Sequence, residues 1–248
     1  MKLTWLGHAC FLAEQDGYTI LLDPYTGVEG YPPLTETAVR AADWERLARW
    51  KAKGGYTVTL KTRMTVTRED GKDWEPRLQV HKILCSHGHH DHNAVDQAET
   101  VPFDGPCPFA VRTVETFHDD QGGALRGTNT IHILSAGGVT VAHLGDLGHP
   151  LSPEQVKAVG PLDAVLIPVG GYYTIDAAGA KAVCEALKPK CVIPMHYRHG
   201  SCGYPVIAEA EDFLALWPQA EVRRLEEASL EVDGSARGVV VPRFRREG

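Results

Sequence analysis

The chain has 248 residues, of which 43% are hydrophobic and 23% are charged, and its formal net charge is −7. This composition is ordinary for a globular protein and excludes the disordered and collagen-like classes. No stretch resembles a signal peptide or a membrane span, so the sequence predicts a cytoplasmic protein without a membrane partner.

The charge distribution limits the expected binding partners, and the cysteine pattern indicates the state of the thiols. The chain has no basic tail or arginine-rich stripe, so we expect no long nucleic acid as a partner; a small or localised nucleic-acid substrate stays open. The six cysteines are scattered without a Cys-x-x-Cys pair, which predicts reduced and mostly buried thiols.

The N-terminal part is a predicted β-meander. Apolar runs over 2–6, 9–14 and 18–22 are typical of short strands. His8 lies in the first turn, where it would either bond to local backbone or have a functional role, supporting ligand residues or lining a pocket and contacting substrate. Asp23 follows the third run, and we expect it to cap structure or accept a hydrogen bond rather than to bind a metal.

An inserted segment at about 36–80 follows. Residues 35–52 have the apolar spacing of a helix. Residues 56–67 alternate as one strand, and residues 78–85 return as a second strand after a turn. This helix-plus-hairpin would be a lid, a dimer arm or decoration, and an accessory or oligomer-forming role is favoured over a catalytic one.

The stretch 86–92 reads Ser-His-Gly-His-His-Asp-His and comes directly after a short apolar run. Neutral imidazole nitrogens and a carboxylate oxygen are ligands that zinc and similar cations accept. In a tight turn, His87 and His89 would face one ion while Asp91 and His92 face a second. A solvated histidine-rich loop and a single structural metal are the alternatives.

Three later residues occupy equivalent positions at strand ends. His118 follows a predicted strand over 109–117, Asp146 follows one over 139–144, and His196 follows one over 191–195. Ligands from separate strands must lie at one edge of the sheets to share an ion, so this repeated placement predicts one common site. His132 and His143 lie inside strands, where they would face the core or the sheet surface.

The remaining elements alternate in the C-terminal third. Ser152 and Pro153 suit the N-cap and first position of a helix. Further helices are expected over 176–187 and near 206–216, and residues 93–106 are expected to form a loop. Other predicted strands cover 130–134, 164–169, 221–225, 230–232 and 238–242.

The chain resembles the metallo-β-lactamase superfamily and, within it, the branch of ascorbate-6-phosphate lactonase-like proteins. The matching pieces are Trp5-Leu6-Gly7-His8, Asp23-Pro24-Tyr25, the His-x-His-x-Asp-His motif at 87–92, Gly145-Asp146, 167–171 and Pro194-Met195-His196. The resemblance implies an α/β (α+β) fold, a four-layer αββα sandwich in a single domain over 1–248, with metals at one edge of the two sheets. It also implies the ligand set: His87, His89 and His118 for one metal, Asp91, His92 and His196 for the second, and Asp146 as the bridge.

These features predict a metal-dependent hydrolase with two divalent ions, zinc first, although manganese and iron also suit mixed nitrogen and oxygen ligands. A water activated by the metals would attack a small, anionic lactone or phosphoester, and Asp91 would serve as both ligand and proton acceptor. Arg126 and Asn129 would bind the anionic group of the substrate, unless Arg126 instead pairs with Asp119 or Asp120.

Two rival functions remain at this stage, a phosphodiesterase or nuclease and a catalytically silent metal-binding protein. The same metal centre would serve either rival, because one scaffold hosts many chemistries. A homo-oligomer formed through the inserted segment is also expected.

Overall fold

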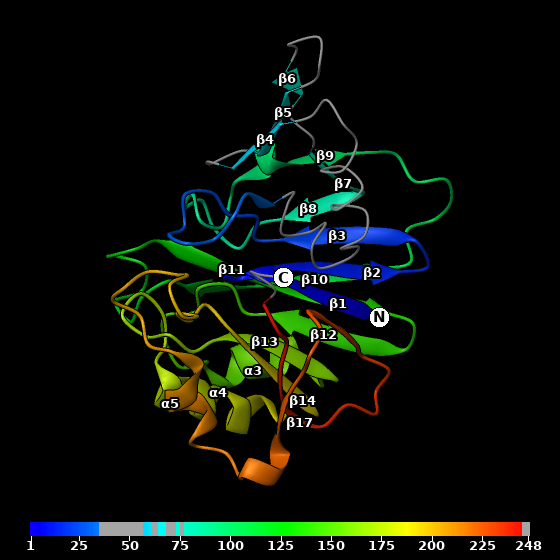
Figure 1. Ribbon diagram of the computed structural model, residues 1–248. Coiled ribbons are helices and arrows are strands. Elements are labelled where there is room, and N and C mark those ends of the chain that lie inside the picture. The colour runs from blue at the N-terminus through cyan, green and yellow to red at the C-terminus, as the bar shows by residue number, and fades with distance from the viewer. Residues whose placement is uncertain (35–56, 61–63, 68–72, 75–76, 245–248) are drawn as a thin grey trace.

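The computed structural model describes residues 1–34, 57–60, 64–67, 73–74 and 77–244. Two β-sheets pack face to face, and helices lie outside the larger sheet (Figure 1). No helix in these described ranges is long and apolar enough to cross a membrane.

The smaller sheet has five strands in the order β16-β1-β2-β3-β8. Its strands are β1 (Lys2–Gly7), β2 (Cys10–Gln15), β3 (Tyr18–Leu22), β8 (Lys82–Leu84) and β16 (Ser229–Glu231). The predicted meander is confirmed, because β1, β2 and β3 pair antiparallel in sequence order. Strand β8 then joins β3 in parallel.

The larger sheet has seven strands in the order β10-β11-β12-β13-β14-β17-β15. Its strands are β10 (Ala110–Phe117), β11 (Thr128–Ala136), β12 (Val139–His143), β13 (Ala164–Pro168), β14 (Cys191–Met195), β15 (Val222–Arg224) and β17 (Gly238–Val241). The first three pair antiparallel, and the strands from β12 onward pair in parallel. Strands β13 and β14 are completely buried, which explains their unbroken apolar sequences.

Three helices lie on the side of the larger sheet that faces away from β1–β3 (Figure 1). They are α3 (Pro153–Val159), α4 (Ala177–Leu187) and α5 (Ala210–Leu214). Ser152 caps α3 in a capping box, with proline inside the first turn, as the sequence predicts. Helix α5 is shorter than the 206–216 expected for it, because residues 205–207 form a turn and a bend and Glu209 forms an isolated bridge with Arg198.

The interior between the two sheets is a continuous apolar core that includes Leu3, Phe11, Leu21, Ile133 and Ile167. Contact between the sheets is direct. His143 on β12 donates to the Ala9 carbonyl at 2.8 Å and lies edge-on to Phe11, with ring centroids 6.3 Å apart. The mixed α/β fold with packed sheets is as predicted. The helix expected over 35–52 lies outside the described residues.

Three predictions for the region before β10 are wrong. Residues 56–67 form two antiparallel strands, β4 (Thr57–Leu60) and β5 (Met64–Thr67), which pair in a small sheet with β6 (Asp73–Trp74). The same alternation continues through both strands, and Lys61-Thr62-Arg63 between them carries no glycine or proline to mark a turn.

The expected strand 78–85 is also divided, at His81. Strand β7 (Leu78–Val80) pairs with β9 (Ala98–Thr100), whereas β8 pairs with β3. Residues 93–106 are therefore not wholly a loop, since they contain β9 and the 3-10 turn Val95–Gln97. Such three-residue strands are stabilised by long-range pairing rather than by local pattern.

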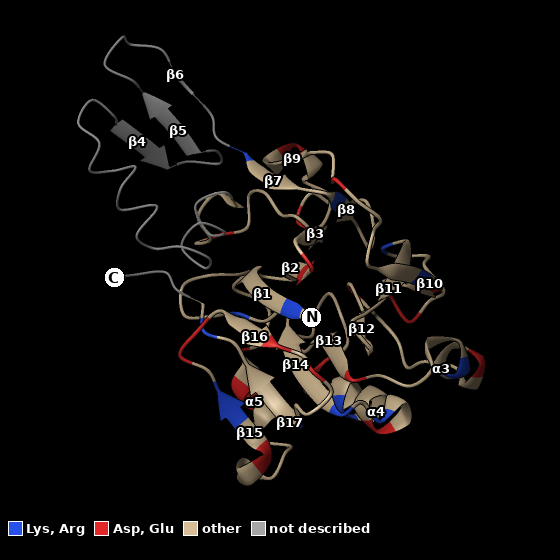
Figure 2. Ribbon diagram, turned by 90° about the vertical axis from the view of Figure 1, so that its right-hand side faces the viewer, with Lys and Arg blue, Asp and Glu red and all other residues tan. Residues whose placement is uncertain are grey.

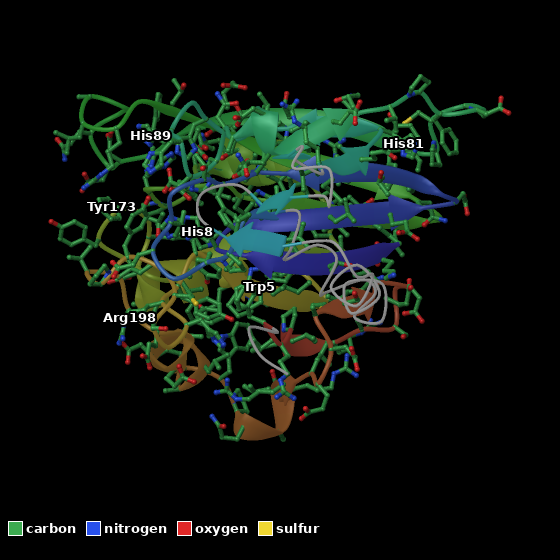
Figure 3. All side chains as sticks on the ribbon, turned by 45° about the horizontal axis from the view of Figure 1, so that its top comes forward. Trp5, His8, His81, His89, Tyr173 and Arg198 are labelled. Atoms are coloured by element: carbon green, nitrogen blue, oxygen red, sulfur yellow. The ribbon has the colours of Figure 1, made fainter. Side chains whose placement is uncertain are left out.

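Strand direction brings the site together. Strands β1, β3 and β8 run in one direction in the smaller sheet, and β10, β12, β13 and β14 share a direction in the larger one. The residues that follow these strands therefore lie at one edge of each sheet. Figure 3 shows His8 and His89 at one end of the sandwich and His81 at the other.

Candidate metal centre

The histidines and aspartates at the strand ends form two adjacent groups of potential ligands. In the first group, one ligand atom from each of His87, His89 and His118 lies within 4.8 Å of the others. In the second group, His8, Asp91, His92 and His196 meet the same criterion. The sequence predicts that these residues converge, with the exception of His8, and the structure brings all of them together.

Asp146 lies between the two groups. Its Oδ2 is 3.2 Å from His118 Nε2 and 3.2 Å from His196 Nε2. Its Oδ1 is 3.1 Å from His92 Nε2. One carboxylate thus contacts histidines of both groups.

The donor atoms fit divalent cations. His87 Nε2, His92 Nε2, His196 Nε2 and Asp146 Oδ1 are buried and have no hydrogen-bond partner among the described residues. Buried polar atoms are normally satisfied, so unsatisfied nitrogens and a carboxylate oxygen aimed at one point indicate a site for an ion. Donors that share a tetrahedral zinc at about 2.1 Å lie about 3.4 Å apart, which is close to the contacts that Asp146 makes.

Hydrogen bonds to Nδ1 of His92 and of His87 determine which ring nitrogen faces the candidate metal centre. His92 Nδ1 donates to Asp23 Oδ2 at 2.8 Å. His87 Nδ1 donates to Ser86 Oγ at 3.0 Å, and that hydroxyl donates to Asp23 Oδ2 at 2.6 Å. Both rings therefore have a proton on Nδ1, so Nε2 is the nitrogen of each ring that would bind an ion, the usual arrangement of histidine ligands. The expectation that Asp23 accepts hydrogen bonds is confirmed.

Burial and neighbouring charges determine the protonation states of His87, Asp146 and His92. Burial, reinforced by the neighbouring His92, lowers the pKa of His87 to about 3, so its imidazole is neutral. Burial alone would raise the pKa of Asp146, but the surrounding His196 and His92 hold it well below its ordinary value. Burial would lower the pKa of His92, but Asp146 and Asp23 together raise it. In the absence of cations His92 is the histidine that balances these buried carboxylates.

The turn that carries Asp146 is built on Asn129 and Gly145. Asn129 is completely buried; its amide donates to Thr116 Oγ1 and to the Leu144 carbonyl, and its Oδ1 accepts from the Asp146 backbone N–H at 2.9 Å. Gly145 has a φ of +55°, and a side chain there would collide with Asn129 and Ser86. Asn129 is thus committed to holding Asp146, and we do not propose it for contact with substrate.

Arg126 lies in a loop that is shaped by Asp119. The Asp119 carboxylate accepts four backbone N–H bonds, from Gln121 and Gly123 on Oδ1 and from Leu125 and Arg126 on Oδ2. The Arg126 guanidinium donates to the Tyr172 carbonyl at 3.2 Å and lies 5.7 Å above the Tyr173 ring. Within the described chain no carboxylate lies within ion-pair distance of this guanidinium, so the pairing with Asp119 or Asp120 is not formed.

Tyr204 is a site residue that sequence reasoning missed. Its hydroxyl donates to Asp91 Oδ2 at 3.1 Å, and its ring lies 5.6 Å from Tyr173. It belongs to the irregular segment between β14 and α5, where no motif or periodicity distinguishes it. Tyr204, Tyr173 and Tyr172 form a row of aromatic rings beside the candidate metal centre, and the last two follow β13.

His8 is placed differently from a residue of an open pocket. Its side chain is completely inaccessible, and its ring centroid is 4.1 Å from that of His196. Substrate contact remains a prediction for this residue, but its burial among the ligands favours a role directed at the centre itself.

The remaining histidines lie outside the two groups. His132 on β11 bonds to the Cys85 carbonyl, and His143 on β12 bonds to the Ala9 carbonyl, which agrees with their predicted places inside strands. His149 accepts from the Phe117 backbone N–H, and His199 packs against Trp5. His90 is exposed at the variable position of the motif.

Comparison with known proteins agrees with the geometry. The family model described as the beta-lactamase superfamily domain matches residues 2–196. UPF0173 metal-dependent hydrolases from Carboxydothermus hydrogenoformans and Archaeoglobus fulgidus are 27% and 29% identical to this chain. The first match covers 84% of this chain and 88% of the relative, and the second covers 86% and 89%.

A solved structure of a metallo-beta-lactamase superfamily protein from Thermotoga maritima is also similar. It is 29% identical, its TM-score is 0.64, and the match covers 97% of each chain. The matched region of the family model includes every residue of the two ligand groups and Asp146. The chain belongs to the beta-lactamase superfamily.

Proposed function

We propose that this protein, a metal-dependent hydrolase like its relatives, works with two divalent ions. His87, His89 and His118 would hold the first ion, Asp91, His92 and His196 the second, and Asp146 would bridge them. The observation that supports this reading best is that Asp146 Oδ2 lies 3.2 Å from a histidine nitrogen of each group. Zinc suits the nitrogen-rich first group, and manganese or iron also suit mixed ligation.

When bound, such ions lower the pKa of a coordinated water and polarise the bond under attack. The chain supplies the rest of the chemistry. Asp91 would accept the proton that the attacking water loses. Burial would raise the pKa of Asp91, but contacts with His8 and His92 hold it below its ordinary value, so the carboxylate is ionised and ready to accept. The Tyr204 hydroxyl orients that carboxylate from the open side.

The proposed substrate is a small anionic lactone or phosphoester. The Arg126 guanidinium lies 5.7 Å above the Tyr173 ring and suits a carboxylate or phosphate group. Figure 2 shows acidic and basic positions side by side on α3 and α4 rather than a basic stripe, which disfavours long nucleic acids. A place in the ascorbate-6-phosphate lactonase-like branch stays a prediction of the sequence.

A phosphodiesterase is the second candidate. The Arg126 guanidinium would bind the anionic group of a phosphodiester as well as that of a lactone, and the contacts of Asp146 with both ligand groups would suit either substrate. Turnover of bis-p-nitrophenyl phosphate without turnover of lactones would favour this alternative.

The test combines metal analysis with generic substrates. We expect purified protein to carry two equivalents of divalent metal by elemental analysis and to hydrolyse lactones bearing a carboxylate or phosphate group. His89→Ala should remove metal and abolish turnover, whereas His81→Ala, at the opposite end of the sandwich (Figure 3), should change neither. Turnover that survives in His89→Ala would overturn the proposal.

Self-association through the inserted segment 36–80 is a separate proposal. Size-exclusion chromatography with light scattering, applied to the full chain and to a variant in which a short glycine-serine linker replaces that segment, tests it. A monomeric full chain would contradict it.

A further inference from the structure

The ring of His8 is buried and has no conventional hydrogen-bond partner in the described part of the chain. Its side chain has no exposed surface, and neither Nδ1 nor Nε2 has a hydrogen-bond partner among the described residues. A buried imidazole normally satisfies at least one nitrogen with protein or water. Something other than a protein hydrogen bond is therefore needed to complete the surroundings of this ring.

The backbone around His8 is fixed in a conformation that directs the ring inward. His8 has a φ of +52° and follows Gly7, whose φ is +111°. The pairing of β1 with β2 is irregular at this point, and any side chain at residue 7 would collide with Tyr31. Left-handed conformations of residues other than glycine persist where the surrounding structure enforces them, often at functional sites.

Two hydrogen bonds hold this conformation. The His8 carbonyl accepts one from Trp5 Nε1 at 3.0 Å and one from the His196 backbone N–H at 3.2 Å. The second bond ties His8, at the end of β1, directly to a member of the second ligand group at the end of β14. His8 is consequently positioned by the same contacts that position His196.

The distances around the ring are those of a ligand. His8 Nε2 is 3.4 Å from Asp91 Oδ2, and ligand atoms of His8, Asp91, His92 and His196 all lie within 4.8 Å of one another. Two ligands of one tetrahedral ion are separated by about 3.4 Å.

We propose that His8 is an additional ligand of the second ion, through Nε2. This proposal rests on the dinuclear centre proposed above and extends its ligand set beyond the seven residues that the sequence motifs identify. The second ion would then have five protein donors, namely the nitrogens of His8, His92 and His196 and the carboxylates of Asp91 and Asp146. The first ion would have four, from His87, His89, His118 and Asp146.

The unequal donor counts predict unequal metal preferences. Four donors, three of them imidazole, suit tetrahedral zinc. Five donors with two carboxylates suit an ion that accepts higher coordination numbers, such as manganese or iron. The second position would therefore exchange zinc for manganese more readily than the first.

A simpler role for His8 is to orient the Asp91 carboxylate without touching the ion. The two roles are separable with His8→Gln and His8→Ala. Glutamine can still donate a hydrogen bond to Asp91 but replaces the imidazole nitrogen with a weaker amide ligand, whereas alanine removes both functions. Loss of an outer partner costs roughly 10–100-fold in metal affinity, and we expect loss of a direct ligand to cost about 100-fold or more.

The experiment measures metal binding rather than turnover. Chelator-treated wild type, His8→Gln, His8→Ala and the control His81→Ala are titrated with zinc by calorimetry and with cobalt by visible absorption. We expect two ions in wild type and in His81→Ala. In both His8 variants we expect one tight ion, a second ion weakened by about 100-fold or more, and a changed cobalt spectrum for that second ion alone.

Each outcome has a separate meaning. Wild-type affinity for both ions in His8→Gln overturns the proposal for His8 and leaves the dinuclear centre standing. Binding of fewer than two ions by wild type overturns the dinuclear centre itself. Circular dichroism and melting of the metal-free proteins verify folding, and His8→Gln, which keeps most of the side-chain volume, carries the test if His8→Ala does not fold.

Discussion

Asp23 Oδ2 accepts a hydrogen bond from His92 Nδ1 at 2.8 Å, and both side chains are completely buried. The same carboxylate accepts from the backbone N–H and the hydroxyl of Ser86. It therefore links the end of β3 to the start of the histidine-rich stretch 86–92 and determines the tautomer of His92, a proposed ligand. Its φ of +46° is a conformation that aspartate and asparagine tolerate better than most residues.

This relationship gives the first prediction, for Asp23→Asn. Asparagine can keep the backbone conformation, but an amide NH₂ facing His92 Nδ1–H would favour the wrong tautomer and withdraw the Nε2 lone pair. We expect the affinity for one of the two ions to fall by about 10–100-fold, measured by calorimetric titration. Asp16→Asn, in a surface turn with similar φ, is the matched control. Equal affinities in Asp23→Asn and wild type would contradict the role given to Asp23.

A second prediction concerns the turn before Asp146. Gly145→Ala would force a methyl group against Asn129 and Ser86 at a left-handed φ, so we expect a loss of about 1–3 kcal/mol in the free energy of unfolding. Displacement of Asp146 should also weaken both ions. Urea denaturation and metal analysis measure the two effects.

Gly160→Ala is the control for this turn. Gly160 has a φ of +75°, but no atom lies within 4 Å of the added methyl group, so it reports backbone strain alone. If Gly145→Ala and Gly160→Ala lose equal stability and bind metal equally, the close packing at Gly145 has no special importance.

The sequence predicts most of the candidate centre, because the proposed ligands follow segments that the sequence pattern marks as strands. His118 and His196 come directly after β10 and β14, Asp146 follows shortly after β12, and the shared direction of these strands brings their ends to one edge. The β-meander and the cap of α3 are likewise local patterns with local causes. Residues that depend on such short-range signals are the ones that sequence reasoning recovers.

The missed features depend on long-range contacts. The Tyr204 hydroxyl bonds to Asp91, which is 113 residues away in the sequence. Tyr204 lies in irregular backbone, so no periodic pattern predicts its place in the site. In the sequence Asn129 resembles a polar loop residue near Arg126. In the structure it lies at the start of β11, and its Oδ1 accepts a hydrogen bond from the Asp146 backbone N–H. The division of 78–85 into two strands arises because β7 and β8 pair with different sheets.

The third prediction concerns recognition of substrate by Arg126. Arg126→Ala should raise KM for an anionic lactone or phosphoester by roughly tenfold or more, since a hydrogen bond to a charged group contributes about 1.5–3 kcal/mol. It should leave metal content and turnover of a neutral lactone unchanged. Steady-state kinetics on the paired substrates measures this difference.

Arg198→Ala is the matched control for Arg126. Its guanidinium already pairs with Glu209 at 2.7 Å, in a cavity lined by residues of β15 and the C-terminal segment. We expect its removal to leave KM for the anionic substrate unchanged. Equal effects of the two arginine substitutions would point to a general effect of surface charge.

The last prediction is a pH dependence of the loop that follows His118. Burial would raise the pKa of Asp119, but hydrogen bonds from four backbone N–H groups, that of Arg126 foremost, lower it from 3.8 to about 2. Because the folded pKa lies below the unfolded one, the ionised carboxylate stabilises the fold fully above about pH 4, and this contribution is lost as pH falls through about 2.

Asp119→Asn keeps one acceptor oxygen but removes the charge and the second oxygen. We therefore expect Asp119→Asn to be less stable than wild type at neutral pH, and the difference to shrink as pH is lowered from about 4 to about 2. Urea denaturation of the metal-free proteins across this range measures it, with Asp120→Asn, on the exposed neighbour, as the control. A stability difference that stays constant across the range would show that the Asp119 charge does not hold the loop.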